Sequence, residues 1–122
     1  MNTYTNDQQA INEIVDFYFK GTYEGNADLI RQVFHPAAHI TGILQGQYYD
    51  WTLTDFIARV TQAPTPALKK EIYNKAIINM DCQGEAAMVK ARVAVGNFIF
   101  TDYITLLKID GHWVIRNKSF TA

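Results

Sequence analysis

The sequence lacks the features that mark several whole classes of protein. It has one cysteine, Cys82, in 122 residues, so no internal disulfide can form and a reducing cytoplasm is the expected location. Eleven basic residues against twelve acidic ones give no electrostatic reason to expect nucleic acid or an anionic membrane as partner. No apolar run approaches the roughly 20 residues that a membrane span needs. We therefore expect residues 1–122 to form a single globular domain without membrane segments.

The spacing of apolar residues in the N-terminal half predicts three helices. The first has an apolar face formed by Ile11, Ile14, Val15, Tyr18 and Phe19. It is expected to end at Gly21, and the second helix to begin after Asn26 and to end before Pro36. The third begins at Thr52. Between the last two helices, residues 38–44 predict one short strand followed by a loop.

From Glu71 onward the hydrophobic period changes to two, which is typical of strands. Four strands are predicted, at residues 71–81, 86–95, 98–109 and 112–120. Their connections are short, and the last one is Asp-Gly, a strong hairpin signal. The chain is therefore predicted to be an α+β protein with an antiparallel meander in its C-terminal half.

Pairing these strands through the shortest turns predicts a polar spot on the face that the helices cover. Asp102 then lies opposite Ala91 on one side and Ser119 on the other. Asn74 and Asn117 fall on the same face, toward the same end of the sheet. The other face carries most of the charged residues, including Lys90, Arg92, Arg116 and Lys118. Because an unpaired buried carboxylate is unfavourable, this polar spot indicates a pocket.

The order of these elements resembles the nuclear transport factor 2-like superfamily. The matching stretches are Ile14–Gly25, DLIRQVFHPAAHITG and FTDYITLLKIDGHWVIRNKSF, and they are nearest to the group labelled lumazine-binding, with SnoaL-like and ketosteroid isomerase-like proteins close by. The resemblance implies a cone, in which a curved antiparallel sheet (the meander plus one short strand) wraps around about three helices. It also implies a homodimer formed through the outer face of the sheet.

The resemblance implies that an enzyme of this kind would use an Asp, or an Asp–His pair, assisted by a Tyr. Asp102 is then the candidate general base, with Tyr18 or His35 as assistant. The alternative is a structural Asp102, a core Tyr18 and a His35 that only closes its helix. The expected ligand-binding residues are Phe34, His39, Trp51, Asn74, Phe98, Phe100, Asn117 and Ser119.

Two classes of function remain open. One is a small-molecule-binding cone protein, with an unidentified, partly apolar, ring-containing ligand, that could be a cofactor-independent acid–base enzyme of the isomerase, dehydratase or cyclase type. The other is a non-catalytic ligand-binding or dimerisation module. No cofactor or metal is expected: His35 and His39 have a zinc-like spacing, but Pro36 breaks the helix that would align them.

Overall fold

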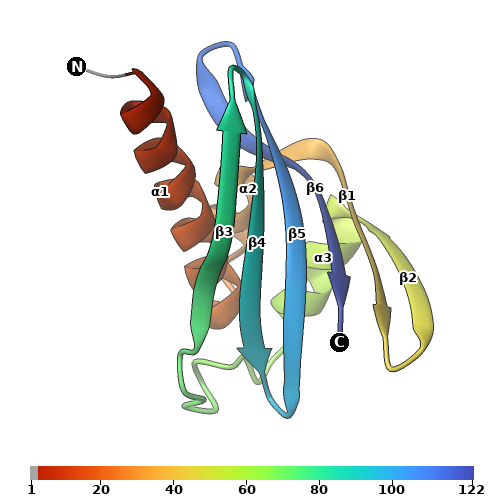
Figure 1. The fold of residues 1–122 in the computed structure, drawn as a ribbon. Coiled ribbons are helices and arrows are strands. Elements are labelled where there is room, and N and C mark those ends of the chain that lie inside the picture. The colour runs from red at the N-terminus through yellow and green to blue at the C-terminus, as the bar shows by residue number, and fades with distance from the viewer. Residues whose placement is uncertain (1–2) are drawn as a thin grey trace.

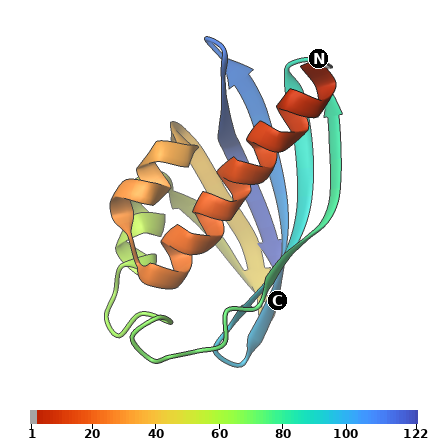
Figure 2. The ribbon, with the colours of Figure 1, turned by 90° about the vertical axis from the view of Figure 1, so that its left-hand side faces the viewer.

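The computed structural model describes residues 3–122, with side chains from residue 6 onward, as one curved sheet with helices on its concave side (Figures 1 and 2). The helices are α1 (Thr3–Glu24), α2 (Ala27–Val33) and α3 (Leu53–Val60). The strands are β1 (Phe34–Leu44), β2 (Gln47–Thr52), β3 (Lys75–Gln83), β4 (Ala86–Val95), β5 (Phe98–Ile109) and β6 (His112–Thr121). Within the described residues, no helix is both long and apolar enough to cross a membrane.

The sheet has six strands in the order β2-β1-β6-β5-β4-β3. It is mixed, because β1 runs parallel to β6 whereas every other neighbouring pair is antiparallel. The sequence predicts a loop where β2 lies, so the expectation of one short N-terminal strand was incomplete. A two-residue turn at Gln45 and Gly46, both with positive φ, joins β1 to β2.

The helix ends follow from specific residues. Asn26 caps α2 by accepting a hydrogen bond from the Leu29 N–H, and Thr52 caps α3 in the same way, as predicted. However, α1 passes Gly21 and ends at Glu24, before Gly25 with its φ of 66°. Gly21 instead permits close helix packing, since an added Cβ would lie 3.0 Å from the side chain of Ile30.

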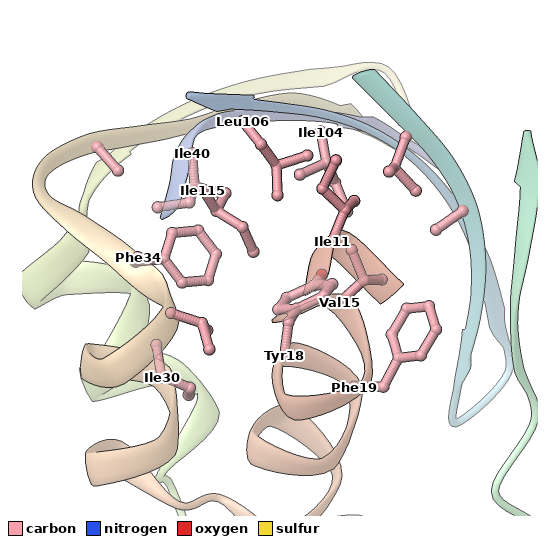
Figure 3. Packing of buried hydrophobic residues seen from close by; sticks show 14 of the residues in the cluster. Ile11, Val15, Tyr18, Phe19, Ile30, Phe34, Ile40, Ile104, Leu106 and Ile115 are labelled. Carbon is pink, nitrogen blue, oxygen red and sulfur yellow. The ribbon is translucent and has the colours of Figure 1, made fainter. Parts of the chain in front are cut away.

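The core lies between the concave face of the sheet and the helices (Figure 3). Its fully buried apolar side chains include Ile11, Val15, Ile30, Ile40, Val89, Ile104, Leu106 and Ile115. They come from α1, α2 and four neighbouring strands, so they tie both helices to the centre of the sheet. Burial of each such side chain contributes about 1.5–3 kcal/mol of stabilisation.

Two β-bulges change which residues face the core. Arg116 is an extra residue in β6, because Ile115 pairs with Leu106 while Asn117 pairs with Thr105. Side chains on the C-terminal side of this bulge are therefore shifted by one position. A second shift occurs in β3 between Ile77 and Asn79. The antiparallel pairing of β4 with β5, including Asp102 opposite Ala91, is as predicted.

Candidate functional site

A cavity of about 520 Å³ lies between the concave face of the sheet, the C-terminal half of α1, α3 and the segment 61–74 that follows α3. Its lining combines aromatic, aliphatic and charged side chains from most elements of the fold. The residues are Tyr18, Thr22, Leu44, Trp51, Phe56, Arg59, Val60, Gln62, Ala63, Pro64, Pro66, Lys69, Val93, Val95, Phe100, Asp102, Lys118 and Phe120. Such a volume is in the range of small-molecule sites.

One wall of the cavity is aromatic. The rings of Trp51 and Phe120 are stacked, with centroids 5.6 Å apart and planes at 15°, and Phe100 meets Phe120 edge-on at 5.7 Å. Phe120 lies flat on β1 because Gly42 has no side chain there, and an added Cβ would come within 2.5 Å of the ring. The guanidinium of Arg59 covers Trp51 at 4.5 Å. This wall offers flat apolar surfaces that suit a ring.

In contrast to this apolar wall, the cavity lining also contains a buried polar cluster formed by Tyr18, Asp102 and Lys118. The Tyr18 hydroxyl donates to Asp102 Oδ2 over 2.6 Å, and Lys118 Nζ donates to Tyr18 Oη over 2.7 Å. Lys118 Nζ also lies 3.8 Å from Asp102 Oδ2. Asp102 is 1% exposed and Lys118 is 6% exposed. Helix α1 and the β5–β6 hairpin, which are far apart in the sequence, thus bring together a chain of donors that ends on one carboxylate.

Burial sets the protonation preferences of this cluster. Burial raises the pKa of Tyr18 well above its usual value, and the Asp102 charge adds to that effect, so Tyr18 is a neutral donor. Burial lowers the pKa of Lys118, although Asp102 acts in the opposite direction. The Lys118 ammonium rests on aromatic faces, 4.5 Å from the Phe56 ring centroid and 5.5 Å from that of Phe120. The cluster is therefore compact and poorly solvated.

Two buried polar atoms beside this cluster have no hydrogen-bond partner in the described part of the chain. They are Asp102 Oδ1 and Lys75 Nζ. Burial lowers the pKa of Lys75 to about 8, and the Asp102 charge only partly offsets this. Because unpaired buried polar atoms are unfavourable and Asp102 lines the cavity, Asp102 Oδ1 is the candidate acceptor for a polar group of a ligand, whereas Lys75 is not part of the lining.

The structure brings four of the predicted site residues to the cavity. Asp102 and Tyr18 touch each other there, and Trp51 and Phe100 line the aromatic wall. Phe34 contributes to the core instead, packed edge-on against Tyr18 at 5.7 Å (Figure 3). Phe98 lies at the start of β5, 39% exposed and outside the cavity lining.

The histidines lie on the surface, away from the cavity lining. His39 Nδ1 lies 2.9 Å from Asp50 Oδ1, and both side chains are about half exposed. His35 Nδ1 accepts the backbone N–H of Ala37 at the exposed start of β1. The prediction that His35 and His39 line the site was wrong in placement, because β1 begins at Phe34 and directs both side chains outward.

The predicted placement of Asn74, Asn117 and Ser119 on the inner face was also wrong. Asn74 is exposed and precedes β3. The bulge at Arg116 turns Asn117 and Ser119 to the outer face, where both are exposed. Asn117 Oδ1 accepts the His39 N–H, and the Ser119 hydroxyl shares a hydrogen bond with Thr41. These residues connect β6 to β1 and do not reach the cavity.

Lys118 and Phe120 are two site residues that the sequence pattern did not predict, and Lys118 was expected on the outer face. The same bulge turns it inward together with Phe120. One signal was available in the sequence. The apolar residues Trp113 and Ile115 occupy odd positions, whereas Phe120 occupies an even one, and such a change of parity within a strand predicts a bulge.

Comparison with known proteins agrees with this architecture. A family model described as "Putative lumazine-binding" matches residues 6–121. A nuclear transport factor 2-like protein of unknown function from Silicibacter pomeroyi DSS-3 is 22% identical over 98% of each chain, with a TM-score of 0.83. One from Shewanella baltica OS155, also of unknown function, is 23% identical over 98% of this chain and 96% of its own, with a TM-score of 0.84.

A third such protein of unknown function, from Methylobacillus flagellatus KT, is 26% identical over 95% of this chain and 91% of its own, with a TM-score of 0.80. Among curated proteins, none matches this chain. The solved structures confirm the cone fold, and the family model confirms the resemblance stated from the sequence.

Proposed function

This chain belongs to the family described as "Putative lumazine-binding", in the nuclear transport factor 2-like superfamily, and from that premise we propose that it binds a small ring-containing metabolite in its cavity. The observation that carries the proposal is the pairing of two surfaces in one cavity: an aromatic wall and a buried polar cluster. The buried polar cluster is not explained by stability, because a buried charge pair stabilises a fold less than apolar side chains of the same size.

The proposed pose follows from what each surface can recognise. The ring lies against Phe100, Phe120 and Trp51, whose faces form the wall. An N–H or O–H of the ligand donates to Asp102 Oδ1, and Lys118 donates to a carbonyl oxygen beside it. Lumazine is a flat bicyclic compound with N–H and C=O groups on its edge, so it satisfies this description and is the first probe to use.

A catalytic function is the second candidate. In that proposal Asp102 acts as the general base of a cofactor-independent isomerase, dehydratase or cyclase, with Tyr18 as the proton donor. Asp102 lines the cavity, and its Oδ1 has no hydrogen-bond partner among the described residues, which supports this proposal. We favour binding without turnover, because the other carboxylate oxygen already accepts a hydrogen bond from Tyr18 and lies 3.8 Å from Lys118 Nζ, so these groups are engaged with one another.

Nuclear magnetic resonance titration with lumazine tests the proposed site. We expect backbone shifts to concentrate at Thr22, Val93, Phe100 and Phe120, which surround the cavity. Phe120→Ala should weaken binding by about tenfold, as the loss of one stacked ring contact. The control is Tyr48→Ala, since Tyr48 is exposed and lies outside the cavity lining. Shifts spread over the outer face of the sheet, with none at the cavity, would contradict the proposal.

We also propose a homodimer through the outer face of the sheet. Large apolar side chains are exposed there on β3, β4 and β5, among them Ile78, Met88, Ile99 and Tyr103. Light scattering should give twice the 13.9 kDa mass of the monomer. Ile99→Lys should shift the mass to that of the monomer, while a wild-type monomer would refute the interface. A cytoplasmic location, expected from the lone cysteine, stays a prediction.

A further inference from the structure

We propose that Lys118 is a nucleophilic amine that captures the carbonyl group of an aldehyde or ketone in the cavity as an imine. This inference rests on the proposed function, because the carbonyl compound has to enter the same cavity. Lys118 lines the cavity, and its side chain is buried, with 6% of the residue exposed. An amine held in an apolar pocket is the arrangement that favours attack on carbonyl carbon.

The surroundings of Lys118 make its ammonium easier to deprotonate than a surface one. Its Nζ is packed over the rings of Phe56 and Tyr18, at 4.5 and 5.0 Å from their centroids. Burial lowers the pKa of Lys118, and its Nζ is surrounded by aromatic rings rather than water. Hydrophobic surroundings are a usual way of activating a lysine.

Tyr18 and Asp102 supply the proton path that imine formation needs. Lys118 Nζ donates to Tyr18 Oη at 2.7 Å, and Tyr18 in turn donates to Asp102 Oδ2 at 2.6 Å. The ammonium proton passes to Tyr18 Oη as the Tyr18 proton passes to Asp102. The free amine then has a lone pair, and the proton is stored 3.8 Å away on a carboxylic acid rather than lost to solvent.

The reaction balances without another reagent. The Lys118 lone pair forms an N–C bond to the carbonyl carbon, and the carbonyl oxygen takes a proton from the attacking nitrogen to give a carbinolamine. Its nitrogen lone pair then expels the hydroxyl group, which leaves as water with the proton returned from Asp102 through Tyr18. An ammonium and a carbonyl compound thus become a protonated imine and one water molecule. The aromatic wall holds the body of the ligand while the bond forms.

Reductive trapping of the wild-type protein tests this directly. The protein is incubated with benzaldehyde and sodium cyanoborohydride, and benzylation of each lysine is followed over time by peptide mass spectrometry. We expect Lys118 to react at least about tenfold faster than Lys90, which lies on the outer face. This comparison needs no variant. Labelling of Lys118 no faster than that of Lys90 would overturn the inference.

Two variants separate chemistry from mere access. Tyr18→Phe keeps the ring and removes the relay, so it should slow the labelling of Lys118 by about tenfold or more without changing that of Lys90. Lys118→Arg keeps the charge and should abolish the rapid label. An unchanged rate in Tyr18→Phe would overturn the relay.

Benzyl alcohol distinguishes failure of this inference from failure of the proposed function, because it has the same ring and no carbonyl. If it shifts the resonances of Phe100 and Phe120 while benzaldehyde leaves Lys118 unlabelled, the cavity binds rings and the imine inference is wrong. If neither compound acts at the cavity, both proposals fail.

Discussion

The concave face of the sheet has two halves that are made by the same strands and differ in almost every physical respect. In the packed half, Ile104 of β5 and Ile115 of β6 are fully buried among aliphatic side chains below α1. In the hollow half, Asp102 of β5 and Lys118 of β6 are equally buried, but they face a cavity. In β5, only two positions separate the buried apolar Ile104 from the buried carboxylate of Asp102.

The comparison teaches that stability and recognition are assigned to different ends of one face. In the packed half, the burial of apolar side chains stabilises the fold, and these side chains have no proposed role in ligand binding. The hollow half buries Lys118 and Asp102, and the buried atoms Lys75 Nζ and Asp102 Oδ1 are unpaired within the described residues, which lowers stability. Sites for ligands commonly sacrifice stability in this way.

The largest effect is expected in the packed half. Ile104→Ala should lower the free energy of unfolding by about 4 kcal/mol, because it removes buried methyl groups and leaves a cavity. Urea denaturation measures it. The control Leu68→Ala removes an exposed side chain of the segment 61–74 and should change stability by less than about 0.5 kcal/mol. Equal effects from both changes would mean that the packed half is not the source of stability.

The next effect concerns the buried pair in the hollow half. Lys118→Met should lower the free energy of unfolding by about 3 kcal/mol, since it leaves the Asp102 carboxylate buried beside Tyr18 without a cation. Replacing both charges, as in Asp102→Leu/Lys118→Met, should restore stability to within about 1 kcal/mol of the wild type. A double variant as unstable as the single one would show that the pair holds the fold together.

Removing the unpaired amine should stabilise the protein. The pKa of Lys75 falls from 10.5 to about 8 on folding, so the folded state binds fewer protons than the unfolded state between these values. Stability contributed by this group therefore rises as pH increases from about 8 toward 10. Lys75→Met should raise the free energy of unfolding by about 2 kcal/mol at neutral pH, and the gain should shrink toward pH 10.

Urea denaturation at several pH values measures this effect, with Lys90→Met on the outer face as control. The series stops at pH 10 because the pKa of Tyr18 is raised, so its own contribution to stability is lost above that value. A destabilised Lys75→Met variant would show that the lysine has a partner in solution.

The smallest effect is expected from the floor of the aromatic wall. Gly42→Ala places a methyl group against the Phe120 ring, which has to move toward the cavity. We expect a loss of about 1 kcal/mol in stability and weaker binding of lumazine. Ser119→Ala, in the neighbouring strand but on the outer face, should change neither. Unchanged binding in Gly42→Ala would show that the ligand does not use Phe120.

The two halves also differ in how far the sequence predicts them. The boundaries of β4 and β5, residues 86–95 and 98–109, are confirmed because two-residue turns fix the register on either side of β5. In the hollow half, Asp102 was placed correctly because the alternation along β4 and β5 is regular, and Tyr18 because the apolar face of α1 keeps its helical spacing. The packed half therefore follows from periodicity and turn chemistry alone.

The rest of the hollow half cannot be predicted from the hydrophobic pattern, because the bulge in β6 and the segment 61–74 shape it. The extra residue Arg116 reverses the alternation in β6, which exchanges Asn117 and Ser119 for Lys118 at the cavity. The change of parity between Ile115 and Phe120 indicates a bulge in β6, but the sequence pattern does not say which residue between them is the extra one. The strand β2 was missed for a similar reason, since it is a mostly exposed edge.

The most direct test of the proposed cavity site is native mass spectrometry of freshly purified wild-type protein beside the Asp102→Leu/Lys118→Met variant, each titrated with lumazine. The account predicts that the wild type holds one lumazine per chain and that the folded double variant holds none, because the fold survives without the polar cluster and recognition does not. Equal binding by both proteins, or no binding by the wild type of lumazine or any co-purified ring compound, would contradict it.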